Sequence, residues 1–168
     1  MSELPEQPIA VQYWSVEDAR KRLEITEAAA KQRPSGPIRE GVARLEDLGA
    51  LVGLGDAKTR KDLRRFPGYL GLLDPRTGEV ERLEAAPRGA RPLSWSEDGL
   101  RLMFVSEGNS GSLQLYEYDR SSKESRRLTA GPRMHPVGTY GPGDRIAYLA
   151  VAVEKNSAGL SIEVAGRH

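Results

Sequence analysis

Several residue types on which common functions depend are absent or rare in this sequence. None of its 168 residues is cysteine, which excludes disulfides, thiolate metal sites and a cysteine nucleophile. The only two histidines, His135 and His168, lack the spacing of a metal-ligating pair. No hydrophobic run approaches the roughly 18 residues of a membrane span. The sequence therefore predicts no metal site, no cofactor and no membrane-spanning helix.

The serines and acids show no catalytic pattern either. No G-x-S-x-G elbow is present, and the GLGDAKT stretch at 53–59 lacks phosphate-loop spacing because two residues separate Gly55 from Lys58. Four aspartates occupy turn-like positions, where a carboxylate accepts hydrogen bonds from the local backbone: Asp74, Asp98, Asp119 and Asp144. We predict that the chain is not an enzyme.

Charge of neither sign is in excess. Twenty-five Lys and Arg residues face 24 Asp and Glu residues, so the net charge of +1 creates no overall field toward nucleic acid. The most basic stretch, 56–65, holds five cations, but it also holds two acids and no aromatic residue. This composition predicts a short exposed helix or a polar loop. We predict no nucleic-acid partner.

The first ten residues, MSELPEQPIA, contain neither the basic segment nor the apolar core of a signal peptide. This polar, proline-bearing lead-in resembles the tether that follows the processing site of a bacterial lipoprotein. The resemblance implies a periplasmic or cell-envelope protein, and a cytoplasmic location is the alternative.

One helix is predicted after the short apolar segment at 9–14. Ser15 can accept an orphan amide of the first turn, and Asp18 lies three residues later in a capping-box-like arrangement. The helix should end near Gln32 because Pro34 disfavours helical geometry at the residue before it. Its apolar stripe is narrow, so it should lie on a surface rather than inside a core.

From Phe66 onward, short apolar runs alternate with turn residues, which is typical of an all-β assembly. In the PRTGE turn at 75–79, proline presets one φ angle and Gly78 can adopt a positive one. The predicted strands are 69–74, 80–83, 100–106, 113–118, 125–128, 146–153 and 160–164.

These strands belong to an internal repeat. YLGLLDPRTGEVERLEAAPRG, from Tyr69, aligns without a gap to QLYEYDRSSKESRRLTAGPRM, from Gln114. LRLMF from Leu100 then corresponds to DRIAY from Asp144, and a third copy begins at LSIEVAGR from Leu160. The period of roughly 45 residues is the length of one four-stranded propeller blade.

The stretch from Leu93 to Thr129 resembles the repeat of TolB-like, WD-type β-propellers. In that family a W-S-P-D-G-type turn precedes the second strand and R-x-L-T closes the unit. The matching positions here are Trp95, Ser96, Asp98, Gly99, Arg126, Leu128 and Thr129, with Asp74 and Asp119 in the repeated turns. Glu97 replaces the usual proline, and the second copy is degenerate at 139–144. The resemblance covers about 66–166 and implies a fold that is mainly β, with antiparallel propeller-type blades and a short N-terminal helical segment.

The predicted domain organisation has three parts. Residues 1–37 form a tether and amphipathic helix, 38–65 an ambiguous connector, and 66–168 two propeller-type repeats with the start of a third. Propellers typically close with four to eight blades, more than this chain supplies. Blades from the rest of a longer protein, association of copies, or strands from 38–54 would each complete the β unit; we favour blades from elsewhere.

The resemblance implies a non-enzymatic binding or scaffold module that presents a propeller face to protein or peptide partners, as the envelope proteins of that family do. The alternative is the accessory propeller of a larger hydrolase or peptidase. Tyr116, Tyr118 and Tyr140 are the candidate partner surface. A sugar-binding or small-ligand propeller, the third possibility, would need these tyrosines to converge with Trp95 in one pocket. Trp95 itself is expected to pack between blades, beside Leu102 and Phe104.

Overall fold

The computed structural model describes residues 7–31, 57–108, 111–143, 145–154 and 157–165. The chain divides into two compact units. A sheet unit combines 1–13 with 68–168, and a helical unit comprises 14–67. Each is described by itself below.

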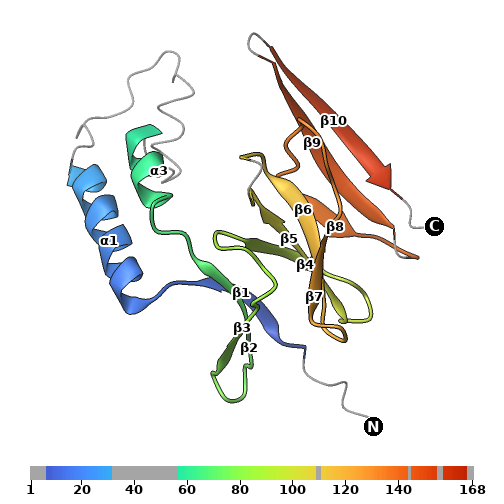
Figure 1. Ribbon diagram of the computed structural model, residues 1–168, viewed down its shortest axis with the longest axis horizontal. Coiled ribbons are helices and arrows are strands. Elements are labelled where there is room, and N and C mark those ends of the chain that lie inside the picture. The colour runs from blue at the N-terminus through green and yellow to red at the C-terminus, as the bar shows by residue number, and fades with distance from the viewer. Residues whose placement is uncertain (1–6, 32–56, 109–110, 144, 155–156, 166–168) are drawn as a thin grey trace, which may run out of the picture. The chain divides into compact units, whose positions relative to one another are not determined.

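The sheet unit consists of three antiparallel sheets (Figure 1). Sheet A contains β1 (Ile9–Tyr13), β2 (Tyr69–Leu73) and β3 (Val80–Arg82) in the order β1-β2-β3. Sheet B contains β4 (Arg91–Trp95), β5 (Arg101–Ser106), β6 (Gln114–Asp119) and β7 (Glu124–Arg127) in chain order. Sheet C contains β8 (Gly138–Tyr140), β9 (Ile146–Glu154) and β10 (Ser157–Ala165). The mainly β, antiparallel fold with a short N-terminal helix is therefore confirmed.

The repeat in the sequence appears as the same hairpin built twice. Asp74 carbonyl oxygen accepts the amide of Gly78, and Asp119 carbonyl oxygen accepts that of Lys123, both at 2.8 Å. Both turn residues have positive φ, 73° at Gly78 and 59° at Lys123. Both aspartate carboxylates also accept amides of their own turn, at 2.8 Å from Arg76 and 2.7 Å from Ser121.

The sequence repeat and the sheets are out of phase by two strands. The first copy supplies β2 and β3 to sheet A and then β4 and β5 to sheet B. The second copy supplies β6 and β7 to sheet B and then β8 and β9 to sheet C. Sheet B alone holds four strands; the described strands of sheet A match positions two to four, and those of sheet C match positions one to three.

Two apolar cores lie on opposite faces of sheet B because successive side chains of a strand point to opposite faces. Leu102, Phe104 and Tyr118 pack with Leu70 and Leu72 of sheet A. The intervening residues of the same strands pack toward sheet C in a second cluster: Met103, Val105 and Leu115, with Ile146. Burying side chains of this size contributes about 1.5–3 kcal/mol each.

The helical unit contains α1 (Val16–Lys31) and α3 (Ala57–Leu63), where the sequence left helix or loop open for 56–65. Ser15 Oγ accepts the Asp18 amide at 3.1 Å, so the predicted N-terminal cap is confirmed. No residue of α1 is buried. The unit is instead joined by Arg22, which donates to the carbonyl oxygens of Leu63 at 2.8 Å and Phe66 at 3.0 Å.

The structure groups the segment at 9–13 with the strands that follow residue 67. The segment at 9–13, expected to belong to the N-terminal part, pairs as β1 with β2 from Ile9↔Leu73 to Tyr13↔Tyr69. Residues 14–67 are therefore inserted between two neighbouring strands of sheet A. The boundary at 37/38 and the strands expected within 38–54 lie outside the described residues.

Candidate functional site

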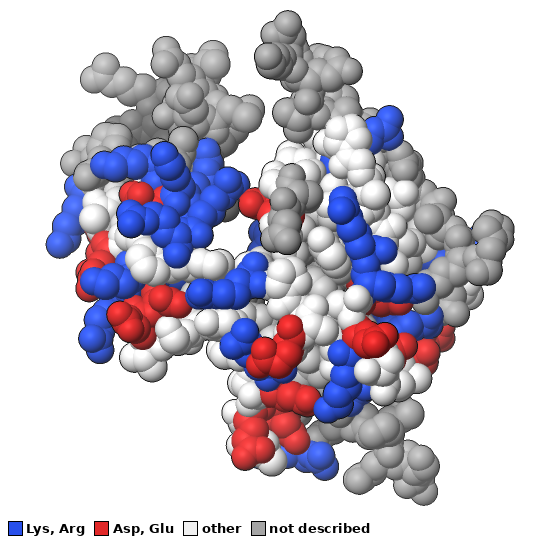
Figure 2. All heavy atoms as spheres, viewed as in Figure 1, with Lys and Arg blue, Asp and Glu red and all other residues white. Residues whose placement is uncertain are grey.

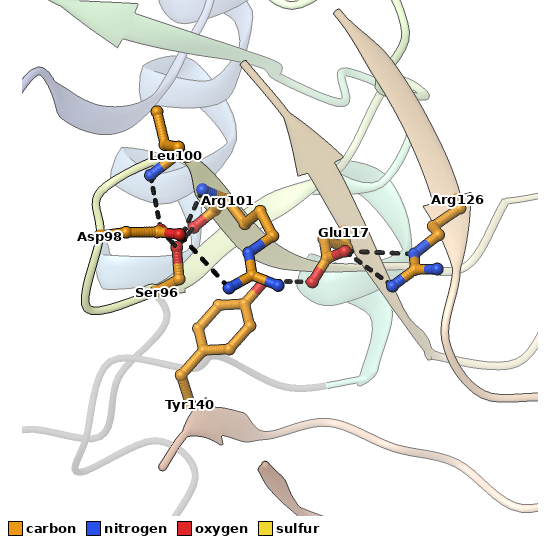
Figure 3. A network of polar contacts seen from close by, with 7 residues as sticks. All are labelled: Ser96, Asp98, Leu100, Arg101, Glu117, Arg126 and Tyr140. Atoms are coloured by element: carbon orange, nitrogen blue, oxygen red, sulfur yellow. Dashed lines mark hydrogen bonds and ion pairs between the residues drawn. The ribbon is translucent and has the colours of Figure 1, made fainter. Parts of the chain in front are cut away.

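The tight turn between β4 and β5 is built around one serine and one aspartate (Figure 3). Ser96 Oγ donates to Asp98 Oδ1 at 2.5 Å, and Asp98 Oδ1 also accepts the Leu100 amide at 3.0 Å. Ser96 Oγ in turn accepts the amide of Arg101 at 2.9 Å. Gly99 has φ of +68°, a region that side chains rarely adopt, so glycine suits this position. The motif residues thus serve the backbone of the turn.

The same contacts change the acidity of the turn. The hydrogen bond from Ser96 lowers the pKa of Asp98 below its ordinary value, with the Leu100 amide and Arg101 acting in the same direction. Arg101 Nη2 lies 3.4 Å from Asp98 Oδ2. A carboxylate that accepts several donors is stabilised in its charged form, so Asp98 remains an acceptor rather than a proton donor near neutral pH.

A buried carboxylate joins sheet B to sheet C beside this turn. Glu117 of β6 is only 3% exposed, and its Oε2 accepts the hydroxyl of Tyr140 from β8 at 2.6 Å. Arg126 of β7 donates from Nε to Glu117 Oε1 at 3.1 Å, and its Nη2 lies 3.1 Å from the same oxygen. Figure 3 shows the three side chains converging from their separate strands.

The geometry of Glu117 favours a structural role over a chemical one. Both carboxylate oxygens are already occupied by Tyr140 and Arg126, which offsets the cost of burying the charge. The Tyr140 hydroxyl and the Arg126 guanidinium come from the two strands β8 and β7, so the carboxylate ties three strands together. The network therefore holds sheets B and C in a fixed relative arrangement through the Glu117 side chain.

The closing R-x-L-T motif has a similar role at the other end of β6. Thr129 Oγ1 accepts the amide of Leu115 at 2.9 Å and donates to Gln114 Oε1 at 2.8 Å. Gln114 is fully buried, and His135 Nδ1 lies 3.2 Å from the same Oε1. His135 is itself 4% exposed and packs edge-on against Tyr148. The sequence offered no signal for this buried cluster, because single polar residues carry no periodicity.

The structure places the three candidate tyrosines on two sides of sheet B. Tyr116 stacks on Phe104 with ring centroids 5.3 Å apart, and Tyr118 is only 4% exposed; both lie on the sheet A side. Tyr140 lies on the sheet C side, against Glu117. They do not form one exposed surface. The pocket that a sugar-binding or small-ligand propeller would need is therefore not assembled from them.

Trp95 packs against the core cluster that contains Leu102 and Phe104, between sheets A and B. The guanidinium carbon of Arg120 lies 5.8 Å from its ring centroid. One face of this tryptophan is thus taken up by packing. Trp95 also lines a groove between β1 and β4, among whose lining residues none is charged.

A second cavity, of about 610 Å³, opens near the hairpin turns of sheets A and B. Its lining includes Tyr118 and Leu72, with Arg76, Arg120 and Lys123 opposed by Asp74, Glu79 and Glu81. Three cations balance three acids, so the cavity has no preference for a ligand of one charge. Among the described residues, no group of three or more His, Asp or Glu side chains could hold a metal ion. No helix of the described chain is long and apolar enough to cross a membrane.

These features define a class: a β module of propeller-type antiparallel blades whose polar motifs hold turns and sheets in place. No protein-family model matches the chain, and no curated protein matches it. Among solved structures it is similar to a protein described as TolB from Agrobacterium tumefaciens, at 19% identity and a TM-score of 0.46. That match covers 58% of this chain and 37% of the other. TolB from Acinetobacter baumannii is similar at 24% identity and a TM-score of 0.46, over 58% and 24% of the two chains. The chain thus matches well under two thirds of either TolB protein.

Proposed function

We propose that this chain is a non-enzymatic binding module that engages protein or peptide partners through its blades. The proposal rests on one observation about the sheets. Sheet B has four strands, whereas the described strands of sheets A and C number three each. In the described chain, β1 and β10 each pair with a strand on one side only. Unpaired strand edges offer rows of backbone donors and acceptors to another polypeptide.

The inner arrangement of the sheets favours binding over catalysis. The buried polar side chains of the described residues form hydrogen bonds within the fold: Ser96, Ser106, Gln114, Glu117, Thr129 and His135. Besides the cavity with balanced charges, the surface open to a ligand includes backbone edges and the uncharged groove between β1 and β4. The sequence resemblance to TolB-like propellers supports the same role, and it extends the proposal to a bacterial periplasm or cell envelope.

The test is an unbiased selection of displayed peptides on the immobilised full chain, followed by fluorescence anisotropy titration of the enriched peptides. We expect saturable binding at micromolar concentrations, which corresponds to about −8 kcal/mol. The control is the variant Phe104→Asp, which places a charge in the core and should unfold the sheets. Failure to enrich any peptide that binds the folded chain in preference to this control would contradict the proposal.

A further inference from the structure

Sheet A lacks, among the described residues, the strand that corresponds to β4 of sheet B. The shared hairpins match β2 and β3 to β6 and β7, so β1 takes the place that β5 has in sheet B. In sheet B, β4 pairs antiparallel with β5 on its outer edge. No strand of the described residues pairs with the corresponding edge of β1. The internal repeat therefore supplies a template for what this edge can accept.

A groove of about 460 Å³ runs beside that edge, between β1 and β4. No charged side chain is among the residues that line it. Ile9 of β1, which is 50% exposed, borders it on one side, and Trp95 of β4 borders it on the other. An added apolar segment that covers these side chains gains free energy.

The groove continues an interface that the fold already uses. Leu102 at its floor is fully buried, and Ala10 and Trp95 in its walls pack against the cluster between sheets A and B. A segment placed here would extend that core rather than begin a new one. The lining of the groove therefore suits an apolar occupant.

The register of β4 shifts between Pro92 and Ser94, so this strand is locally irregular beside the groove.

The next junction shows how a first strand fits against the preceding sheet. There β8, the first strand of sheet C, lies against β4 and β5 of sheet B. Gly138 of β8 approaches so closely that an added Cβ would lie 2.7 Å from Met103 Sδ and 2.8 Å from Leu115 Cδ1. At this junction the first strand therefore packs tightly through a residue without a side chain.

We propose that the groove between β1 and β4 binds an extended segment of a protein partner, which adds to β1 as an antiparallel fourth strand of sheet A. The segment spans about five residues, the length of β1, and directs small or apolar side chains into the groove. Backbone hydrogen bonds to β1 provide the affinity, and the apolar walls select against charged side chains. This inference rests on the proposed function and assigns it a site.

The probes are the peptides enriched on the full chain and a synthetic peptide with the sequence ARPLSWS of residues 90–96, whose strand β4 occupies this position in sheet B. The test variant is Ile9→Glu, which places a charge on β1 beside its unpaired edge, at a half-exposed position. The matched control is Val137→Glu, at a residue 55% exposed and outside the groove lining. Thermal melting of both variants checks that the fold is retained.

We expect Ile9→Glu to weaken peptide binding by about tenfold or more, because a charge must be desolvated on binding. Val137→Glu should remain within about twofold, since a twofold change is well under 1 kcal/mol. N-methylation of alternate peptide amides should also weaken binding by about tenfold or more, because main-chain bonds to β1 are lost.

Other outcomes separate this inference from the proposed function. Peptides that bind both variants equally would overturn the groove as their site and leave the proposed function standing. Absence of any peptide binding would overturn both. A concentration-dependent mass increase in light scattering that Ile9→Glu abolishes would overturn the partner assignment, because a second copy of the chain would then be the occupant.

Discussion

The two units of the chain are stabilised by different means. Sheet B is enclosed by apolar contacts on both faces, and Leu102, Met103 and Phe104 are fully buried. In the helical unit, α1 buries no residue, and Leu23 is 58% exposed. In the described part of that unit, the Arg22 guanidinium bonds two carbonyl oxygens and lies 4.6 Å from the Trp14 ring centroid, and Trp14 Nε1 donates to the Phe66 oxygen at 3.0 Å.

The difference teaches how local and repeated patterns contribute to a fold. Repeated strands build a common core, so each sheet is stabilised by its neighbour. The hydrogen bonds of Arg22 orient α1 against α3, but they add few apolar contacts. Figure 2 shows the helical unit covered largely by charged side chains, with Lys and Arg gathered on it. We therefore expect the two units to respond differently to the same kind of change.

The largest effect should follow from Phe104→Ala. This side chain is fully buried and stacks on Tyr116, so its removal loses transfer free energy and leaves a cavity. The free energy of unfolding of the sheet unit should fall by about 3–5 kcal/mol. Urea denaturation followed by near-ultraviolet circular dichroism measures this change. Leu23→Ala in exposed α1 is the control, and an equal loss there would contradict the comparison.

Arg22→Ala should act on the helical unit alone. It removes the bonds to Leu63 and Phe66 and the contact with Trp14. Hydrogen bonds to charged groups contribute about 1.5–3 kcal/mol, so amides of α1 and α3 should exchange roughly tenfold faster or more. Hydrogen exchange resolved by residue is the measurement. Faster exchange in β5 as well would show that the units are not independent.

Replacing 14–68 by Asn-Gly tests the insertion directly. Tyr13 and Tyr69 are paired at the end of β1 and β2, where a two-residue turn can close the hairpin. Each halving of a loop changes stability by only about 0.6 kcal/mol, so the sheet unit should keep its cooperative transition. Thermal melting compares the shortened chain with the full one. Loss of the β signal would mean that the helical unit is required for the sheets.

The smallest effect concerns pH. The pKa of Asp98 is lowered in the folded chain, so the folded state binds a proton less readily than the unfolded state. The stabilisation is complete above the ordinary value of 3.8 and is lost as the pH falls through the lower folded value. Melting temperatures measured at successive acid pH values should decline less steeply in Asp98→Asn. An unchanged slope would contradict this role of the turn.

The repeat allowed much of the sheet unit to be predicted. The hairpin turns at Asp74 and Asp119, the tight turn at Ser96 to Gly99 and the helix start at Ser15 all follow from local chemistry. Three strands were not predicted: β1, β4 and β8. All three are short, and Pro92 in β4 and Gly138 in β8 also weaken the strand pattern. The candidate tyrosines were misgrouped for another reason. Tyr116 and Tyr118 lie on one face of β6, toward sheet A, whereas Tyr140 belongs to β8 of sheet C and packs on the opposite face of sheet B.

What the sequence determined by itself is everything that depends on a few neighbouring residues: the turns, the period of the repeat, the alternation of apolar residues and the cap of α1. The tertiary structure alone decided that β1 crosses an insertion of more than fifty residues to pair with β2, and that each repeat is divided between two sheets. It also decided that Glu117 meets Tyr140 and that a groove lies beside β1. Strand pairing is specified by side-chain contacts between distant segments, and such contacts exist only once the sheets have packed.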